Sequence, residues 1–251
     1  MPINYLRRLT SPARSDTANR QLGGSLAFVA GAVNAGGFLA VGQYTSHMSG
    51  VVSALADDLA LGQTMLLAAG AGSLLAFMAG AAGSAVMINW ARRRRLHSEY
   101  AMPLMAEAGL LLCFGILGSN LDGHRLLFAP VTVMLLCFVM GLQNAMISKI
   151  SRSEIRTTHV TGLVTDIGIE LGRICYWKLA PKAPGEMPAD DPVPPARRKF
   201  ALLASLLMMF FLGGVAGALG FKALGFIAIV PLAALLFLLA LVPLLDDLSR
   251  H

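Results

Sequence analysis

Long apolar blocks separated by short polar segments dominate the chain. An α-helix needs roughly 20 apolar residues to cross a bilayer. Six blocks approach or exceed that length, at about residues 22–43, 64–90, 101–118, 126–148, 200–220 and 224–245. The pattern predicts an all-α integral membrane protein with six transmembrane helices. The polar residues 1–21 are predicted to be a cytoplasmic N-terminal tail rather than a signal peptide, because the apolar run behind them is too long for one.

Two parts of the sequence resemble each other. F-V-A-G-A-V-N-A at 28–35 shares five of its eight residues with F-V-M-G-L-Q-N-A at 138–145. The hexapeptide T-S-H-M-S-G at 45–50 recurs as T-T-H-V-T-G at 157–162. Chance similarity among Ala, Gly and Leu does not readily supply a paired asparagine and a paired histidine in one alignment. The pattern therefore indicates an internal duplication.

The duplication predicts two repeats of three spans each, residues 22–125 and 126–248. Because three is an odd number, the second repeat enters the membrane in the opposite orientation, which gives an inverted repeat. Many secondary transporters are built in this way, with the substrate site between the repeats. The segment 178–199 is rich in proline and charge, and is predicted to be a cytoplasmic linker within the second repeat.

A second match between the repeats lies farther along. F-M-A-G-A-A-G at 77–83 aligns with F-L-G-G-V-A-G at 211–217. Small residues on one face of a transmembrane helix allow close helix packing. The glycines predicted to do so are Gly80, Gly83, Gly214 and Gly217.

Each copy of the hexapeptide is followed by about 12–15 residues with helical periodicity, too few to cross the membrane. Such a half-helix either lies along the interface or re-enters the bilayer, where it needs protein or a watery cavity around it. Hydroxyl and imidazole groups ahead of it suit an N-cap, and a glycine suits a sharp entry or a close approach to the backbone. The residues predicted to form the two helix starts are Thr45, Ser49, Gly50, Thr157, Thr161 and Gly162.

Polar side chains in or beside the spans are candidates for a solute or ion pathway. The two histidines either bind solute or sense pH, since imidazole titrates near neutrality, or they only cap a helix. The two asparagines either join helices or line the pathway. Glu107 is expected to face the bundle interior and to be either protonated or partnered by a histidine, because an unpaired charge is costly there. Otherwise it is a structural acid with another partner or lies shallowly near the interface. The candidates are His47, His159, Glu107, Asn34, Asn144, Asp58 and Glu170.

The charges are few and unevenly placed. Charged residues make up 14% of the 251 residues, against about a quarter in a soluble domain, and the net charge is +6. Eighteen of the twenty Lys and Arg residues fall on segments that are cytoplasmic if the N-terminus is inside. The positive-inside rule therefore predicts two cytoplasmic termini. The run R-R-R-R at 92–95 is expected to face anionic headgroups rather than nucleic acid.

No pattern in the sequence indicates catalysis. The three cysteines lack the spacing of a disulfide framework or a zinc site. The chain contains no phosphate-binding loop with Lys and Ser/Thr, no H-E-x-x-H and no G-x-S-x-G. We therefore expect no enzyme activity, no metal and no other cofactor.

The first-helix motif F-V-A-G-A-V-N-A-G-G-F-L-A, the turn S-H-M-S-G and an acid in the third span resemble the YoaK-like family of bacterial inner-membrane proteins. The resemblance covers about residues 22–248 and implies a six-helix inner-membrane fold. Relatives commonly carry Asp where this chain has Asn34, and Thr where it has Ser49. The family's function is unknown, so the resemblance implies no substrate. The positions that it implicates are Asn34, His47, Gly50 and Glu107.

These features favour a small secondary transporter or channel in a bacterial inner membrane, with a pathway for an unidentified small solute between the repeats. Protons could drive it through Glu107 and the two histidines. The alternative is a non-transporting sensor or assembly partner that acts through its cytoplasmic loops. The expected partners are the lipid bilayer and the solute, and nucleic acid is not expected to bind. Because a chain of six spans is small, the sequence is also compatible with a homodimer.

Overall fold

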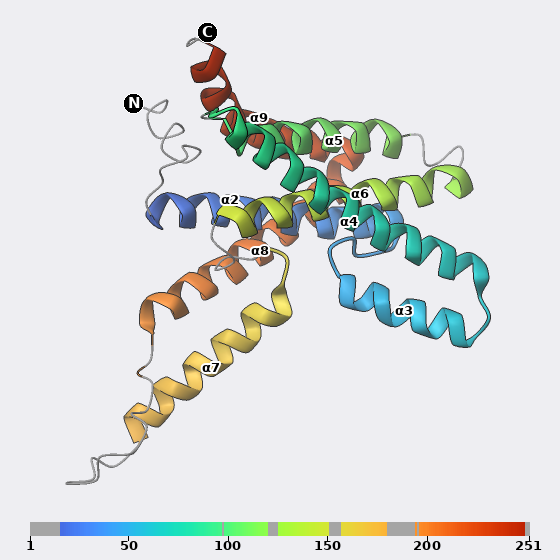
Figure 1. Ribbon diagram of the computed structural model, residues 1–251. Coiled ribbons are helices and arrows are strands. Elements are labelled where there is room, and N and C mark those ends of the chain that lie inside the picture. The colour runs from blue at the N-terminus through green and yellow to red at the C-terminus, as the bar shows by residue number, and fades with distance from the viewer. Residues whose placement is uncertain are drawn as a thin grey trace, which may run out of the picture.

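The structure is a computed structural model that describes residues 16–96, 98–119, 125–150, 157–179, 194 and 196–248. Every regular element in these ranges is a helix (Figure 1). Most of the predicted N-terminal tail lies outside the described residues. The elements are α2 (Asp16–Val41), α3 (Met48–Ala60), α4 (Thr64–Arg93), α5 (Ala101–Ser119), α6 (Arg125–Ile150), α7 (Val160–Leu179), α8 (Arg197–Leu224), the 3-10 helix η1 (Gly225–Ala228) and α9 (Ile229–Leu248).

Five helical segments in the described part of the chain are long and apolar enough to cross a membrane. The fifth covers 49 residues and contains α8, η1 and α9. Within the described residues, the prediction of an all-helical fold with several membrane-length helices is confirmed. The segments are Thr17–Val41, Thr64–Arg93, Ala101–Ser119, Ala129–Ile150 and Arg197–Leu245.

Some helix boundaries differ from those predicted. α2 begins at Asp16 instead of near residue 22, because the polar residues ahead of the apolar block continue the helix. The predicted linker 178–199 is helical at both ends, where α7 runs to Leu179 and α8 starts at Arg197. Its residues 180–193 and 195 lie outside the described part of the chain.

Both hexapeptides lead into a helix that is not among the membrane-length apolar segments. α3 has 13 residues, as predicted, whereas α7 has 20. Both helices begin at the fourth residue of the hexapeptide, and α7 is longer because it continues to Leu179. α7 is long enough to be considered as a membrane span, but it carries four charged residues. It is therefore not among the apolar membrane-length segments.

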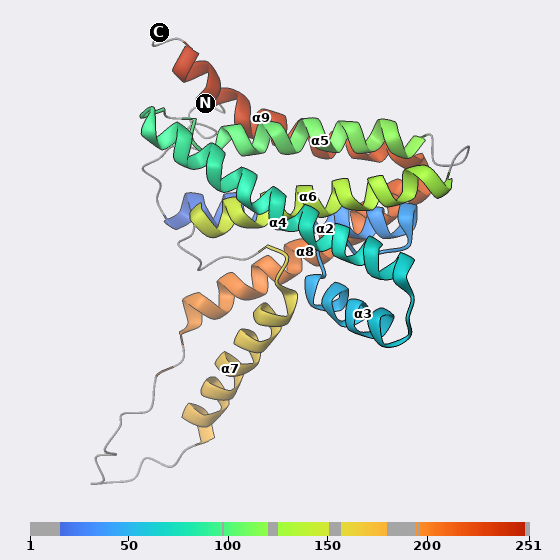
Figure 2. The same cartoon turned by 45° about the vertical axis from the view of Figure 1, so that its right-hand side comes forward.

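The most extensive helix contacts join the first half of the chain to the second. α2 packs along α8, α6 along α4, and α5 along α9. Figures 1 and 2 show α5 and α9 on one side of this bundle and α3 and α7 on the opposite side. α3 and α7 start about halfway along the length of the bundle and run apart from there (Figure 2).

Glycines allow α4 and α6 to cross at backbone contact. A Cβ added to Gly80 would lie 2.0 Å from the carbonyl oxygen of Phe138. A Cβ added to Gly141 would lie equally close, 2.0 Å, to the carbonyl oxygen of Phe77. Neither position has room for a side chain, so these glycines set how closely the two helices pack.

The crossing of α2 and α8 repeats this geometry and corrects the sequence alignment. A Cβ on Gly31 would lie 2.0 Å from the carbonyl oxygen of Phe210, and one on Gly213 would lie 2.0 Å from that of Phe28. Phe77 therefore corresponds to Phe210. The alignment by sequence, which paired Phe77 with the next residue, was one residue off because two phenylalanines are adjacent there.

Only two of the four glycines singled out from the sequence make such close contacts. They are Gly80 and Gly217, whose added Cβ would lie 2.3 Å from the carbonyl oxygen of Ala32. Gly83 and Gly214 have ordinary clearances of 3.8 Å and 3.7 Å to their nearest neighbours. The prediction of close packing therefore holds for the two helices but not for every glycine.

Candidate functional site

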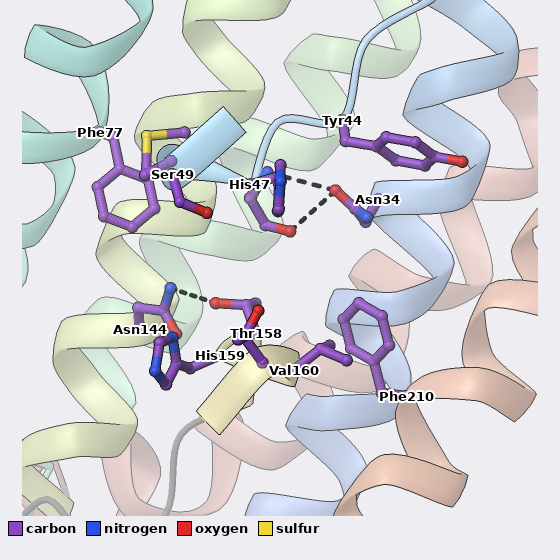
Figure 3. A pocket seen from close by; sticks show the side chains of 13 residues that line it. Asn34, Tyr44, His47, Ser49, Phe77, Asn144, Thr158, His159, Val160 and Phe210 are labelled. Atoms are coloured by element: carbon purple, nitrogen blue, oxygen red, sulfur yellow. Dashed lines mark hydrogen bonds between the residues drawn. The ribbon is translucent and has the colours of Figure 1, made fainter. Parts of the chain in front are cut away.

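A cavity of about 580 Å³ lies where the two halves of the chain meet. α3 and α7 both begin at its wall, so the two hexapeptides, far apart in the sequence, face one space (Figure 3). We call this space the central cavity. Its lining residues are Asn34, Tyr44, Ser46, His47, Met48, Ser49, Phe77, Asn144, Thr158, His159, Val160, Thr161 and Phe210.

The two asparagines hold the two hexapeptides in corresponding ways. In α2, Asn34 Oδ1 accepts hydrogen bonds from the N–H of Ser46 at 3.3 Å and from its hydroxyl at 2.9 Å. In α6, Asn144 Nδ2 donates a hydrogen bond to Oγ1 of Thr158, the counterpart of Ser46. Among the described residues, each amide thus joins a helix to the turn that follows it, not to another long helix, and also lines the central cavity.

Each imidazole folds over the glycine three residues later. A Cβ on Gly50 would lie 2.2 Å from Cδ2 of His47, and a Cβ on Gly162 would lie 2.2 Å from Cδ2 of His159. Both glycines lie in the first turn of a helix, and neither has a positive φ. Of the two roles predicted for them, the sharp helix entry is therefore wrong. They permit a close approach to the backbone, which the imidazole ring makes.

The prediction of side-chain capping is also wrong for α3. His47 occupies the N-cap position, but its side chain makes no capping hydrogen bond. Its carbonyl oxygen accepts from the N–H of Val51 at 3.1 Å, which closes the first turn. The earlier N–H groups, at Met48, Ser49 and Gly50, find no acceptor among the residues described. The helix start therefore presents unused donors.

A second cavity of about 390 Å³ lies beside α3 and α4. It shares Tyr44 and His47 with the central cavity, so these two side chains stand between the two spaces. Tyr44 stacks on Phe38, with ring centroids 4.5 Å apart and an interplanar angle of 17°. Gly50 and Asp58 line the second cavity.

Glu170 lies eleven residues after His159, as Asp58 does after His47, so the repeat aligns the two acids. Glu170 lines neither cavity. Its carboxylate is fully buried and accepts a hydrogen bond from the guanidinium of Arg173 at 2.7 Å. The other oxygen accepts from the backbone N–H of Ala196 at 2.9 Å. Because Ala196 is the N-cap residue of α8, Glu170 connects α7 to the start of α8.

Glu107 in α5 is fully buried, and neither carboxyl oxygen has a hydrogen-bond partner among the described residues. Its burial in the bundle interior is as predicted, whereas the alternative of a histidine partner is wrong. α5 packs on α9 and α6, whereas His47 and His159 lie at the starts of α3 and α7, on the other side of the bundle (Figure 1). Glu107 lines neither cavity.

The residues predicted to start the two short helices have different environments. Ser49 and Thr161 line the central cavity. Thr45 and Thr157 do not, and they are 1% and 0% exposed. Neither of these buried hydroxyls has a partner within the described residues. The hexapeptide therefore brings its second to fifth residues to the cavity.

Sequence reasoning missed the aromatic walls of the central cavity. Phe77 and Phe210 come from α4 and α8 and lie at opposite corners of the view in Figure 3. The repeat could have revealed them, because in the correct register a phenylalanine precedes both Gly80 and Gly213 by three residues. Tyr44 lies just before the first hexapeptide, and no sequence pattern pointed to it.

Within the described ranges, no group of three or more His, Cys, Asp or Glu side chains lies close enough together to hold a metal ion. The three cysteines are free, with Cys137 buried and Cys113 and Cys175 exposed. What the central cavity offers a ligand is amide, hydroxyl and imidazole groups between aromatic walls.

The sequence also matches a protein family. Residues 22–242 match the family described as "Protein of unknown function (DUF1275)". The chain belongs to the DUF1275 family. The matched range contains both hexapeptides and the whole central cavity, in agreement with the resemblance to YoaK-like proteins. Among curated proteins and solved structures, no match to this DUF1275 member was found.

Proposed function

We propose that the chain is a small secondary transporter or channel, and that a small solute passes through the central cavity. The observation that best supports this function is that both copies of the duplicated hexapeptide line the same cavity. The cavity is within the size range of small-molecule sites, roughly 300–1,000 Å³. In transporters built from internal repeats, corresponding segments of the two repeats typically line one substrate site.

The architecture in this proposal is a pair of inverted three-span repeats, α2–α5 and α6–α9. The paired contacts support it, since α2 packs on α8 as α6 packs on α4. The segment Arg197–Leu245 supports it as well. Its 49 residues would extend roughly 74 Å as one straight helix, more than twice the hydrocarbon thickness. Two crossings that meet at η1, where Gly225 has a φ of +60°, account for its length.

In this arrangement α3 and α7 are re-entrant half-helices. Both start at the central cavity, near the middle of the bundle, and run apart from there (Figures 1 and 2). Discontinuous helices that begin at the bilayer midplane commonly form the substrate sites of secondary transporters. Irregular backbone is tolerated at that depth because it lines a cavity.

The proposed location is a bacterial inner membrane with both termini cytoplasmic. The distribution of Lys and Arg supports this orientation, and the family resemblance supports the location. Glu107 is not assigned a proton-coupling role, because its carboxyl group lines neither cavity.

A solute screen tests the function. The purified protein in detergent is melted with small neutral, cationic and anionic solutes, beside a His47→Ala/His159→Ala variant. A ligand at about 100 times its Kd adds about 2.7 kcal/mol to the stability of the folded state, enough to raise the Tm. We expect at least one solute class to stabilise the parent but not the histidine variant.

The matched control is Val52→Ala/Val164→Ala, which changes two exposed residues on the same helices, outside the central cavity. It should keep the response of the parent. A parent that responds to no solute class would contradict the proposed function. So would a folded histidine variant that responds as strongly as the parent.

A further inference from the structure

We infer that the solute is a small monovalent organic anion, a carboxylate carried on a compact apolar body. This inference rests on the proposed function, because it names the solute class for the same central cavity. Four features of the cavity carry it: the helix starts, the lining side chains, the placement of the acids and the apolar walls.

Two helix N-termini face the central cavity, those of α3 and α7 (Figure 3). The start of an α-helix carries a partial positive charge and free N–H groups, which favour an anion. In α3 the N–H groups of Met48 and Ser49 are without an acceptor in the described chain, and both residues line the cavity. In α7 the N–H of Val160 donates to the carbonyl oxygen of Thr158 at 3.0 Å, while that of Thr161 is without an acceptor in the described chain. The dipoles of the two helices add at the cavity.

The side chains of the lining supply donors without a charge of either sign. Among the described residues that line the central cavity there is no Asp, Glu, Lys or Arg. His47 and His159 each present at least one ring N–H in any protonation state, and Ser49 and Thr161 present hydroxyl groups. A cation would find no carboxylate here, whereas a carboxylate would find several donors.

The acids that could have reversed this preference lie elsewhere. Asp58 lines the second cavity, and the carboxylate of Glu170 is occupied by Arg173 and the start of α8. Glu107 is enclosed in α5. None of the three acids predicted to serve the pathway therefore lines the central cavity. The electrostatic field in the cavity is set by the two helix starts.

The apolar walls of the central cavity indicate the chemistry of the uncharged part of the solute. Phe77 and Phe210 face the cavity from opposite corners of the view in Figure 3, and Met48 and Val160 also line it. Such walls suit an apolar body. Dianionic phosphate and sulfate groups are usually met by Arg or Lys, which the described lining lacks. A single negative charge is therefore favoured.

Four probes of similar shape and different charge test the inference: benzoate, neutral benzamide, cationic benzylammonium and dianionic phthalate. Binding of radiolabelled benzoate to the purified protein is measured at constant ionic strength, with the other three as competitors. We expect benzoate to bind, and each competitor to be at least tenfold weaker than unlabelled benzoate.

A paired variant tests the site itself. Ser49→Asp/Thr161→Asp places a carboxylate at each helix start, where it suits the helix dipole but repels an anion. We expect it to lose benzoate binding with an unchanged or raised Tm. The neutral variant Ser49→Asn/Thr161→Asn keeps a hydrogen-bond donor at each position and should bind benzoate at least tenfold more tightly than the aspartate variant. The control outside the central cavity, Val52→Ala/Val164→Ala, should bind benzoate within threefold of the parent.

The possible results separate the two proposals. Preferred binding of benzamide or benzylammonium would overturn the anion inference and leave the proposed transport function standing. Benzoate binding that survives in the aspartate variant would overturn it too, as would a lack of binding by all four probes. Failure of the transport function is measured separately. The solute screen tests it, and so does the labelling of cavity positions from the two membrane faces.

Discussion

At the scale of single residues, each histidine of the central cavity is paired with a glycine. The imidazole of His47 occupies the space beside Gly50, and that of His159 occupies the space beside Gly162. The spacing of three residues places the histidine and the glycine on one face of the first helical turn. The glycine therefore fixes where the imidazole lies, and its lack of a side chain is part of the site.

This pairing predicts that Gly162→Ala destabilises the protein through His159. The new Cβ would displace the imidazole, so the free energy of unfolding should fall. In a His159→Ala background the same change should be harmless, with a coupling energy of about 0.5–3 kcal/mol in a double-mutant cycle. Thermal unfolding of the four proteins measures it.

Gly172→Ala on the same helix is the matched control, because a Cβ there meets nothing within 4 Å. It should be neutral or stabilising by up to about 1 kcal/mol. Equal effects of Gly162→Ala with and without His159 would show that the imidazole does not depend on the glycine.

At the scale of elements, the close crossings of α4 with α6 and of α2 with α8 depend on glycine. We predict that Gly141→Ala destabilises strongly, by about 1–3 kcal/mol or more, because its Cβ would lie 2.0 Å from a backbone oxygen of α4. Gly109→Ala in α5 meets nothing within 4 Å and serves as the control. Similar melting temperatures for the two variants would contradict the close crossing.

The connection between α7 and α8 gives a second prediction at this scale. Glu170→Ala leaves Arg173 and the N–H of Ala196 without their acceptor, and should cost about 1.5–3 kcal/mol. Asp58→Ala, at the aligned position, removes a side chain that lines a cavity and should change the Tm little. Chemical denaturation of both variants compares them. An equal cost at the two positions would mean that the acids have equivalent roles.

At the scale of the whole molecule, neither half of the chain can bury its own helices. α2 needs α8, α6 needs α4, and Gln143 Nε2 in α6 donates to the carbonyl oxygen of Leu26 in α2 at 3.2 Å. We predict that residues 1–125 and 126–251 are degraded when expressed separately and form a stable complex when co-expressed. Co-purification from detergent measures this, and a stable isolated half would contradict the interlocked arrangement.

The sequence revealed the features that depend on local pattern. Apolar blocks of membrane length predicted the long helices, and the duplicated Asn and His residues predicted that two distant turns correspond. Asn34 and Asn144 do make corresponding contacts, with Ser46 and Thr158. These predictions succeeded because helix formation and internal similarity are both visible along the chain.

Features that depend on where helices lie in space could not be predicted in this way. Burial of Glu107 followed from its apolar surroundings, but its distance from the histidines is set by the packing of α5 on α9. The role of Gly50 depends on the direction of the His47 side chain, which the sequence does not encode locally. The adjacent phenylalanines at 210 and 211 hid the register that a backbone contact revealed.

The central claim is that the central cavity opens to both faces of the membrane. Its most direct test places single cysteines at Ser49→Cys or Thr161→Cys, in a background with Cys113, Cys137 and Cys175 replaced by alanine. A membrane-impermeant thiol reagent is applied to right-side-out and to inverted vesicles. A Leu75→Cys variant, on an exposed apolar position of α4, is the lipid-facing control.

We predict that the reagent labels both cavity positions from both faces, and the control from neither. Two-sided labelling is expected because Ser49 and Thr161 line one space, and a transport pathway through that space has to be reached from both faces. Labelling of both positions from one face alone would contradict a transport pathway, and would favour a sensor or assembly partner instead.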